Sequence, residues 1–181
     1  MIWGLAYGLL LAALVLRFRT DEEAPAPLVP EPDEPLGLVR LHHATFALVL
    51  LGAPVERMLS APAADWRLAG VALFAAGVLL YRVAGRALGE ALSPFVEPRP
   101  GVPLVTEGIY GLLRHPIYVS QAMIAVGAPL TLGCRHTLAL TAVTLVVLAV
   151  RMHREEEALA RTFPDYPRYA AATKRLLPFV F

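Results

Sequence analysis

Several features are scarce in this chain of 181 residues, and each scarcity excludes a class of protein. The single cysteine, Cys134, cannot form a disulfide within the chain, and it lacks Cys or His partners at zinc-binding spacing. The formal net charge of +1 gives no reason to expect a nucleic-acid partner. The sequence contains no internal repeat and no low-complexity tract. We therefore expect one compact unit without a metal site, in which Cys134 is a packing residue.

Apolar residues, by contrast, are abundant. They make up 57% of the chain, against roughly 45 to 50% in typical soluble domains. An apolar segment in lipid must satisfy its own backbone hydrogen bonds, and these segments lack the alternating pattern of a barrel strand, so helices are expected. The sequence predicts an all-α, polytopic membrane protein with about five transmembrane helices. The five apolar segments are approximately residues 2–16, 38–55, 68–83, 117–132 and 138–150.

The distribution of basic residues predicts an orientation. Among the 16 Lys and Arg residues, only Arg57, Arg67 and Arg135 lie on the side that would face outward if the carboxyl terminus is cytoplasmic. The first apolar segment has no basic residue before it and no cleavage pattern after it, so we expect a retained anchor rather than a secretory signal. We therefore expect an integral, multi-pass membrane protein whose carboxyl terminus and catalytic side face the cytoplasm.

Two connections between the apolar segments differ in character. Residues 21–35 are rich in Pro, Asp and Glu, cannot bury a core, and indicate a cytoplasmic connection without visible chemistry. Residues 89–115 mix four prolines with apolar residues and lead directly into the fourth apolar segment. Loops of this length in a compact unit are often functional.

The end of this second connection carries the first candidate motif. Gly108 can adopt a positive φ or let a ligand approach the backbone, and Tyr110 and Tyr118 each offer a ring and a hydroxyl. Pro116 suits the first turn of a helix, which places His115 near the helix cap, where free N–H groups favour an anion. Taken alone, the motif is also compatible with ordinary residues of a membrane interface.

The second candidate motif begins where the fifth apolar segment ends. We expect that helix to continue through the polar residues 151–163, and a spacing of four puts Arg151 and Glu155 on one helical face. Glu156 would lie about 100° around the helix from Glu155. A solvated charged stem is the simpler interpretation of this segment by itself. The two motifs in this order are much more informative than either one.

Together, the motifs resemble the isoprenylcysteine carboxyl methyltransferase family of integral-membrane enzymes that use S-adenosylmethionine. The resemblance covers residues 86–181, and it divides the chain into residues 1–84, a probable substrate side, and residues 85–181, a catalytic region. The matching positions are Leu104, Val105, Thr106, Gly108, Tyr110, Arg114, His115, Pro116, Tyr118, Arg151, Glu155, Glu156, Leu159, Phe163, Tyr166, Tyr169, Leu177, Pro178 and Phe179.

The resemblance implies a cofactor site for S-adenosylmethionine that faces the cytoplasm, and no metal. It implies that Arg114 and Arg151 orient an acceptor carboxylate, as a bidentate guanidinium can. The residues that it implies for cofactor binding are Val105, Gly108, Tyr110, His115, Pro116, Tyr118, Glu155, Glu156, Tyr166 and Tyr169. Three positions depart from the family pattern: Pro164 replaces a usual Gly, Ile109 a frequent Pro, and Ser120 a frequent Gly.

The expected reaction is methyl transfer to a lipophilic acceptor, most simply a carboxylate on an isoprenoid-like molecule, in contact with the lipid bilayer. Three alternatives remain open: methylation of a phospholipid amine, an NADPH-dependent reductase of the sterol type, and a nonenzymatic scaffold. A reductase should show additional basic contacts for the 2′-phosphate of NADPH, and no clear cluster of this kind is visible. His42 and His43 lie near the start of the second segment, and because adjacent residues face different sides of a helix, they do not suggest a metal pair.

Overall fold

The computed structural model describes residues 2–21, 36–60 and 66–176. These residues form helices and connecting loops, with no β-strand among them and a single isolated bridge between Leu113 and Lys174. The helices are α1 (Ile2–Asp21), α2 (Leu36–Leu59), α3 (Arg67–Leu88), α4 (Pro116–Leu132), α5 (Arg135–Thr162) and α6 (Tyr166–Ala172), with short 3₁₀ turns η1 (Gly89–Ala91) and η2 (Gly108–Gly111). The predicted all-α class is confirmed, and each apolar segment forms a helix.

The lengths and surfaces of these helices are those of a membrane protein. Three segments are long and apolar enough to cross a bilayer, Gly37–Leu59, Arg67–Ala91 and Arg135–Thr162, and Ile2–Leu16 and Pro116–Leu132 are shorter apolar helices. Large apolar side chains project outward from α1, α2, α3 and α5, for example Leu9, Leu51, Leu79 and Val146, each more than half exposed. In a bilayer these side chains would contact lipid rather than water.

Helix α4 is the centre of the bundle, because no residue along its length is exposed. Its closest packing is against α3, where glycines let the two backbones approach, as small residues do in membrane helices. A Cβ atom on Gly127 would lie 2.5 Å from the backbone nitrogen of Phe74, and one on Gly70 would lie 2.3 Å from the backbone nitrogen of Thr131. This contact therefore fixes how α3 and α4 cross.

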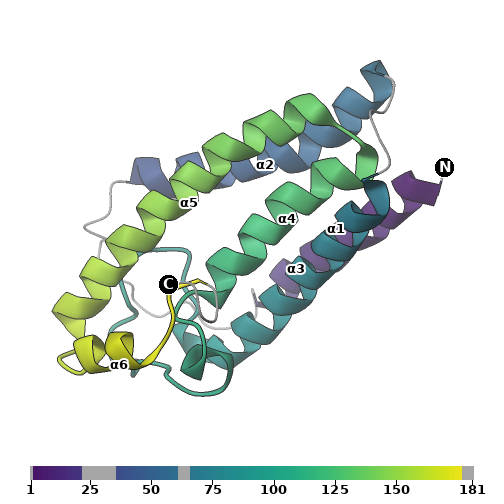
Figure 1. Ribbon diagram of the computed structural model, residues 1–181. Coiled ribbons are helices and arrows are strands. Elements are labelled where there is room, and N and C mark those ends of the chain that lie inside the picture. Colours follow the sequence, from purple (N-terminus) through teal and green to yellow (C-terminus); the bar gives the residue numbers. More distant parts are fainter. Residues whose placement is uncertain (1, 22–35, 61–65, 177–181) are drawn as a thin grey trace.

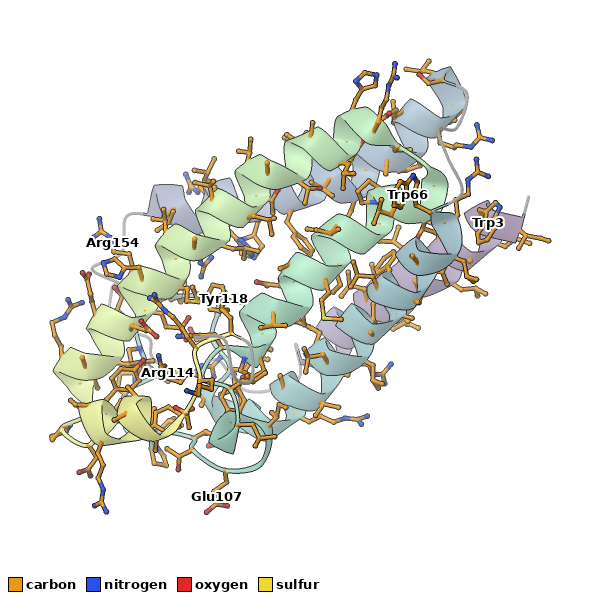
Figure 2. The ribbon with its side chains drawn as sticks, in the orientation of Figure 1. Trp3, Trp66, Glu107, Arg114, Tyr118 and Arg154 are labelled. Carbon is orange, nitrogen blue, oxygen red and sulfur yellow. The ribbon has the colours of Figure 1, made fainter. Side chains whose placement is uncertain are left out.

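The bundle has two ends that are formed by different elements (Figure 1). The turn between α4 and α5 lies at one end together with the start of α1, and α6 and η2 lie at the other. Figure 2 shows Trp3 and Trp66 at the first end and Glu107 and Arg114 at the second. We call these the turn end and the α6 end.

At the turn end, Glu56 of α2 caps the amino terminus of α5. Its carboxylate accepts hydrogen bonds from the backbone N–H of His136 at 3.1 Å and of Thr137 at 2.7 Å, and from the Thr137 hydroxyl at 2.8 Å. Nearby, Cys134 is buried, as predicted for a packing residue, and its thiol donates to the Ala53 carbonyl. The first N–H groups of a helix have no partners within the helix, so Glu56 satisfies groups that would otherwise be unpaired.

Candidate functional site

A cavity of about 560 Å³ lies at the α6 end and is shared by all the long helices. Its volume falls within the range of 300 to 1,000 Å³ that is usual for small-molecule sites. Apolar residues of α1 and α2 line one part of it, and the charged end of α5 lines another. Among its lining residues are Leu14, Phe46, Tyr81, Pro94, Arg99, Val105, Gln121, Ile124, Arg151, Glu155 and Leu159.

The start of α4 is built as the sequence predicted. Pro116 lies in the first turn of the helix, and His115 is the residue at its cap, in a nonhelical conformation. Gly108 has the positive φ that its residue type allows, at 61°. Because His115 is 2% exposed and the Tyr118 ring lies edge-on to it at 5.5 Å, the motif is held inside the protein rather than at a lipid or water surface.

Glu155 faces the cavity from the polar end of α5, which continues to Thr162 as predicted. One of its carboxylate oxygens accepts a hydrogen bond of 2.5 Å from the Tyr118 hydroxyl. Figure 2 shows Tyr118 between α4 and α5, with Arg154 on the outward side of α5. A carboxylate has capacity for more than one donor, so Glu155 can still accept hydrogen bonds from a cationic ligand.

Glu156 instead forms a cluster of ion pairs behind the cavity wall. Its carboxylate lies 3.3 Å from Arg114 Nε, 3.0 Å from His115 Nε2 and 2.5 Å from Arg175 Nη2. We call these four residues the Glu156 cluster. Glu156 does not line the cavity, whereas Arg114 and His115 do. The neighbouring glutamates of the motif thus occupy different environments, one beside the cavity and one within the supporting structure.

Arg114 links the segment that contains α6 to the Glu156 cluster. Besides Glu156, its guanidinium donates to the carbonyl oxygens of Ala170 and Thr173, the latter at 2.6 Å. The backbone N–H of Arg114 also donates to the Lys174 carbonyl at 2.8 Å. These contacts satisfy most of the donors of Arg114, and they place α6 over the cavity.

Arg151 is buried beside the cavity, with 5% of its surface exposed. Its Nη2 atom donates to the carbonyl of Pro94 at 2.6 Å, which holds the loop between α3 and α4 against α5. Two residues of this loop, Glu97 and Arg99, each have a buried side-chain atom without a partner, Oε2 and Nε respectively. The sequence predicted a functional loop here from its length and prolines, but it did not single out these two residues.

Three tyrosines line the cavity from η2 and α6. The hydroxyl of Tyr169 donates to the backbone carbonyl of Tyr110 at 2.7 Å, while the hydroxyls of Tyr110 and Tyr166 are buried without partners in the part of the chain that the structure describes. Burial raises the pKa of Tyr110 and of Tyr166, and the nearby Glu carboxylates act in the same direction. Both hydroxyls therefore remain protonated at neutral pH and can donate a hydrogen bond to a ligand.

The structure brings most of the residues predicted for the site around one cavity. Those that line it are Val105, Tyr110, Arg114, His115, Tyr118, Arg151, Glu155, Tyr166 and Tyr169, and those that do not are Gly108, Pro116 and Glu156. Sequence reasoning missed Arg175, which completes the Glu156 cluster from beyond α6. Only its basic charge near the motif could have suggested it. Among the described residues, no group of three or more His, Cys, Asp or Glu side chains is arranged to hold a metal ion.

A comparison with models of known protein families identifies the family of this chain. Residues 66–166 match the model of the phospholipid methyltransferase family, and the chain belongs to that family. The prediction of an integral-membrane methyltransferase is thereby confirmed at the level of the family, and the assignment to the isoprenylcysteine carboxyl methyltransferases stays a prediction. Helices α1 and α2 precede the matched residues.

Two curated relatives share part of the sequence. The chain is 34% identical over 89 residues to the cobalt-zinc-cadmium resistance protein CzcN of Cupriavidus metallidurans, covering 46% of this chain and 39% of that protein. It is 31% identical over 90 residues to the nickel-cobalt-cadmium resistance protein NccN of Alcaligenes xylosoxydans xylosoxydans, covering 46% and 40% respectively. The similarity thus spans about two fifths of the length of each relative.

Proposed function

We propose that this protein transfers a methyl group from S-adenosylmethionine to a lipophilic acceptor at the membrane surface. The observation that carries the proposal is that one cavity joins the paired-motif residues to the apolar walls of α1 and α2. A polar cofactor and an apolar acceptor must meet in a methyltransferase of this kind, and a shared cavity lets them do so. The family of the chain supports the same activity.

The residues present fit S-adenosylmethionine. The ammonium group of this cofactor needs a carboxylate, its own carboxylate needs donors, and its adenine needs a partly apolar wall. Glu155 supplies a carboxylate at the cavity, and the unpartnered hydroxyls of Tyr110 and Tyr166 supply donors. A buried polar atom without a partner is costly, so a ligand that pairs with these hydroxyls would recover that cost.

The protein's contribution to the reaction would be positioning and exclusion of water. When bound, S-adenosylmethionine supplies an electrophilic methyl group, and transfer requires the acceptor to lie in line behind it. Tyr118 would orient Glu155 through their hydrogen bond, and Arg151 would hold the loop that closes the cavity through its bond to Pro94. The Glu156 cluster would keep α6 and its tyrosines in place.

The preferred acceptor is a carboxylate on a hydrophobic molecule. Arg114 holds the α6 segment through its contacts to Ala170, Thr173 and Glu156. Arg151 is therefore the better candidate for binding an anionic acceptor. Leu14 and Phe46 line the same cavity and offer apolar surface for the hydrocarbon part. In this proposal α1 and α2 form the acceptor side, and the later helices form the cofactor side.

A phospholipid amine is the second candidate, favoured by the family to which the chain belongs. In either case the cavity end would face the cytoplasm. Basic residues support this orientation, because Arg57, Arg67 and Arg135 lie near helix termini at the turn end, while Arg114, Arg151, Arg154, Arg161, Arg168 and Lys174 belong to the α6 end.

Calorimetric binding of S-adenosylhomocysteine to the detergent-purified protein tests the cofactor. We expect micromolar affinity and no binding of NADPH. Glu155→Gln should weaken binding about 10- to 150-fold, because a hydrogen bond to a charged group contributes about 1.5 to 3 kcal/mol. The matched control is Glu157→Gln, which changes an exposed glutamate paired with His153 one turn earlier and should leave the affinity unchanged.

The outcomes separate the alternatives. Binding of NADPH alone would favour a reductase, and binding of neither nucleotide would favour a scaffold. Equal affinities for Glu155→Gln and the unaltered protein would place the cofactor elsewhere in the molecule.

A further inference from the structure

His42 is one of two polar residues, with His43, in the part of the cavity wall that also contains Leu14 and Phe46. It comes from α2, before the residues that match the family, and it lines the same cavity as Arg151 and Glu155. Its side chain is almost completely buried, with 5% of the residue exposed, and it stacks on Phe46 with ring centroids 5.9 Å apart. A buried imidazole in such a wall needs an explanation, since polar groups are costly to bury without partners.

The hydrogen bonding of His42 is incomplete. The Nδ1 atom is shut off from solvent and has no hydrogen-bond partner within the described ranges. A proton on Nδ1 would be a buried donor without an acceptor, so the neutral ring is more stable as the tautomer with its proton on Nε2. Since His42 lines the cavity and Nδ1 is shut off, Nε2 is the ring nitrogen that a ligand in the cavity could reach. The adjacent His43 also lines the cavity, but it is exposed and its Nδ1 lies 2.8 Å from the Val39 carbonyl.

The surroundings of His42 favour an anionic ligand. Arg151 of α5 lines the same cavity, together with Glu155 four residues further along the helix, whose carboxylate accepts a hydrogen bond from Tyr118. The Arg151 guanidinium and an imidazole N–H of His42 are therefore two donors at one cavity. A carboxylate or phosphate oxygen accepts from both, and such charge-assisted hydrogen bonds are stronger than neutral ones.

We propose that His42 and Arg151 together hold an anionic oxygen of the lipid acceptor, with its hydrocarbon part along Leu14 and Phe46. This inference rests on the proposed function and assigns the acceptor side of its cavity. His42 acts as a positioning and specificity residue and takes no part in bond making. The oxygen belongs either to a carboxylate that receives the methyl group or to the phosphate of a phospholipid whose amine receives it.

The test compares lipid binding by His42→Phe, His42→Gln and the unaltered protein in detergent. Phe keeps the ring that stacks on Phe46 and removes the donor, whereas Gln keeps a donor. The probes are a C15 isoprenoid carboxylic acid, dioctanoyl phosphatidic acid, and the C15 isoprenoid alcohol as the uncharged reference. His43→Phe is the matched control, and S-adenosylhomocysteine binding reports on the cofactor side.

We expect the unaltered protein to prefer an anionic probe over the alcohol. His42→Phe should lose about tenfold in affinity for that anion, with unchanged affinity for the alcohol and for S-adenosylhomocysteine. His42→Gln should recover part of the loss, and His43→Phe should behave like the unaltered protein. The anion whose binding depends on His42 identifies the source of the oxygen. A purely structural role for His42 would not change the preference between anion and alcohol.

Two results would overturn the inference and leave the methyltransferase proposal standing: equal binding of the anions by His42→Phe and the unaltered protein, or no preference for an anion in a protein that binds S-adenosylhomocysteine. Absence of S-adenosylhomocysteine binding would instead remove the proposed function. If anion binding still depended on His42 in that case, the pair would be a lipid site unrelated to methyl transfer.

Discussion

The two ends of the bundle use the same chemistry for different purposes. At the turn end, the Glu56 carboxylate accepts three hydrogen bonds from the start of α5, and these bonds cap the helix. At the α6 end, Glu156 is similarly engaged by Arg114, His115 and Arg175, but its neighbour Glu155 has a single hydrogen bond and faces a cavity. A carboxylate at a helix end is therefore no sign of function by itself. What distinguishes Glu155 is unused hydrogen-bonding capacity beside a cavity.

The difference also shows how a site is supported. At the turn end, the connection from α4 to α5 consists of Gly133 and Cys134, and the Glu56 carboxylate caps the helix that follows. The α6 end must hold a long loop and a short helix over a cavity, and it does so with several ion pairs and backbone contacts. Residues behind the cavity wall thus keep the cavity-lining residues in position.

The largest expected effect comes from Gly127→Leu, which disrupts the packing of α3 against α4 on which both ends of the bundle depend. A Cβ atom here would lie 2.5 Å and 2.9 Å from backbone atoms of Phe74, so α3 and α4 would have to separate. We expect a loss of at least about 3 kcal/mol of stability, seen as poor yield and a lower thermal midpoint in detergent. Gly8→Leu on α1 is the control, because a Cβ atom there meets nothing within 4 Å. Similar midpoints for the two variants would contradict the close packing of α3 and α4.

The next effect is that of Glu156→Gln, which should disturb only the α6 end. The change weakens the ion pairs to Arg114 and Arg175, at a cost of about 1.5 to 3 kcal/mol. We expect faster hydrogen exchange in α6 and weaker S-adenosylhomocysteine binding as an indirect result. Exchange measured by mass spectrometry separates this variant from Glu155→Gln, which should weaken binding while α6 exchanges as before. Unchanged exchange in Glu156→Gln would mean that the cluster does not hold α6.

The smallest effect is expected for Glu56→Gln, which alters only the turn end. Loss of the charged cap of α5 should lower stability by about 0.5 to 2 kcal/mol. Binding of S-adenosylhomocysteine should not change, because the cap lies at the turn end, opposite α6 (Figure 1), and residues of α6 line the cavity. Thermal unfolding and calorimetry on one preparation measure both quantities. A loss of affinity as large as that of Glu155→Gln would show that the two ends are coupled.

The sequence predicted the helices and the start of the site because both depend on local order. Apolar segments that lack the alternating pattern of a barrel strand predicted helices α1 to α5. Pro116 after His115 predicted where α4 begins. The continuation of α5 beyond the membrane was also predicted from its charged residues. Three of these helices are long and apolar enough to cross a bilayer, and Ile2–Leu16 and Pro116–Leu132 are shorter apolar helices.

The roles of individual residues depended on contacts between distant parts of the chain. The sequence treated Glu155 and Glu156 as a pair of cofactor ligands, yet their separation around the helix turns one toward the cavity and the other toward Arg175. It predicted that Arg114 binds the acceptor, which stays a prediction, and the structure adds contacts of its guanidinium to carbonyls of Ala170 and Thr173. No local pattern contains these two partners of Arg114, because they lie 56 and 59 residues away in the chain.

The sequence by itself determined that this is an all-α membrane protein with methyltransferase motifs, since hydrophobicity, helix periodicity and motif order are properties of neighbouring residues. Only the tertiary structure decided which motif residues reach a shared cavity, which ones support it, and that the buried His42 of α2 lies at the same cavity as Arg151 of α5. The physical reason is that burial and unsatisfied hydrogen bonding arise where separate helices pack together, and the close crossing of α3 and α4 fixes that packing.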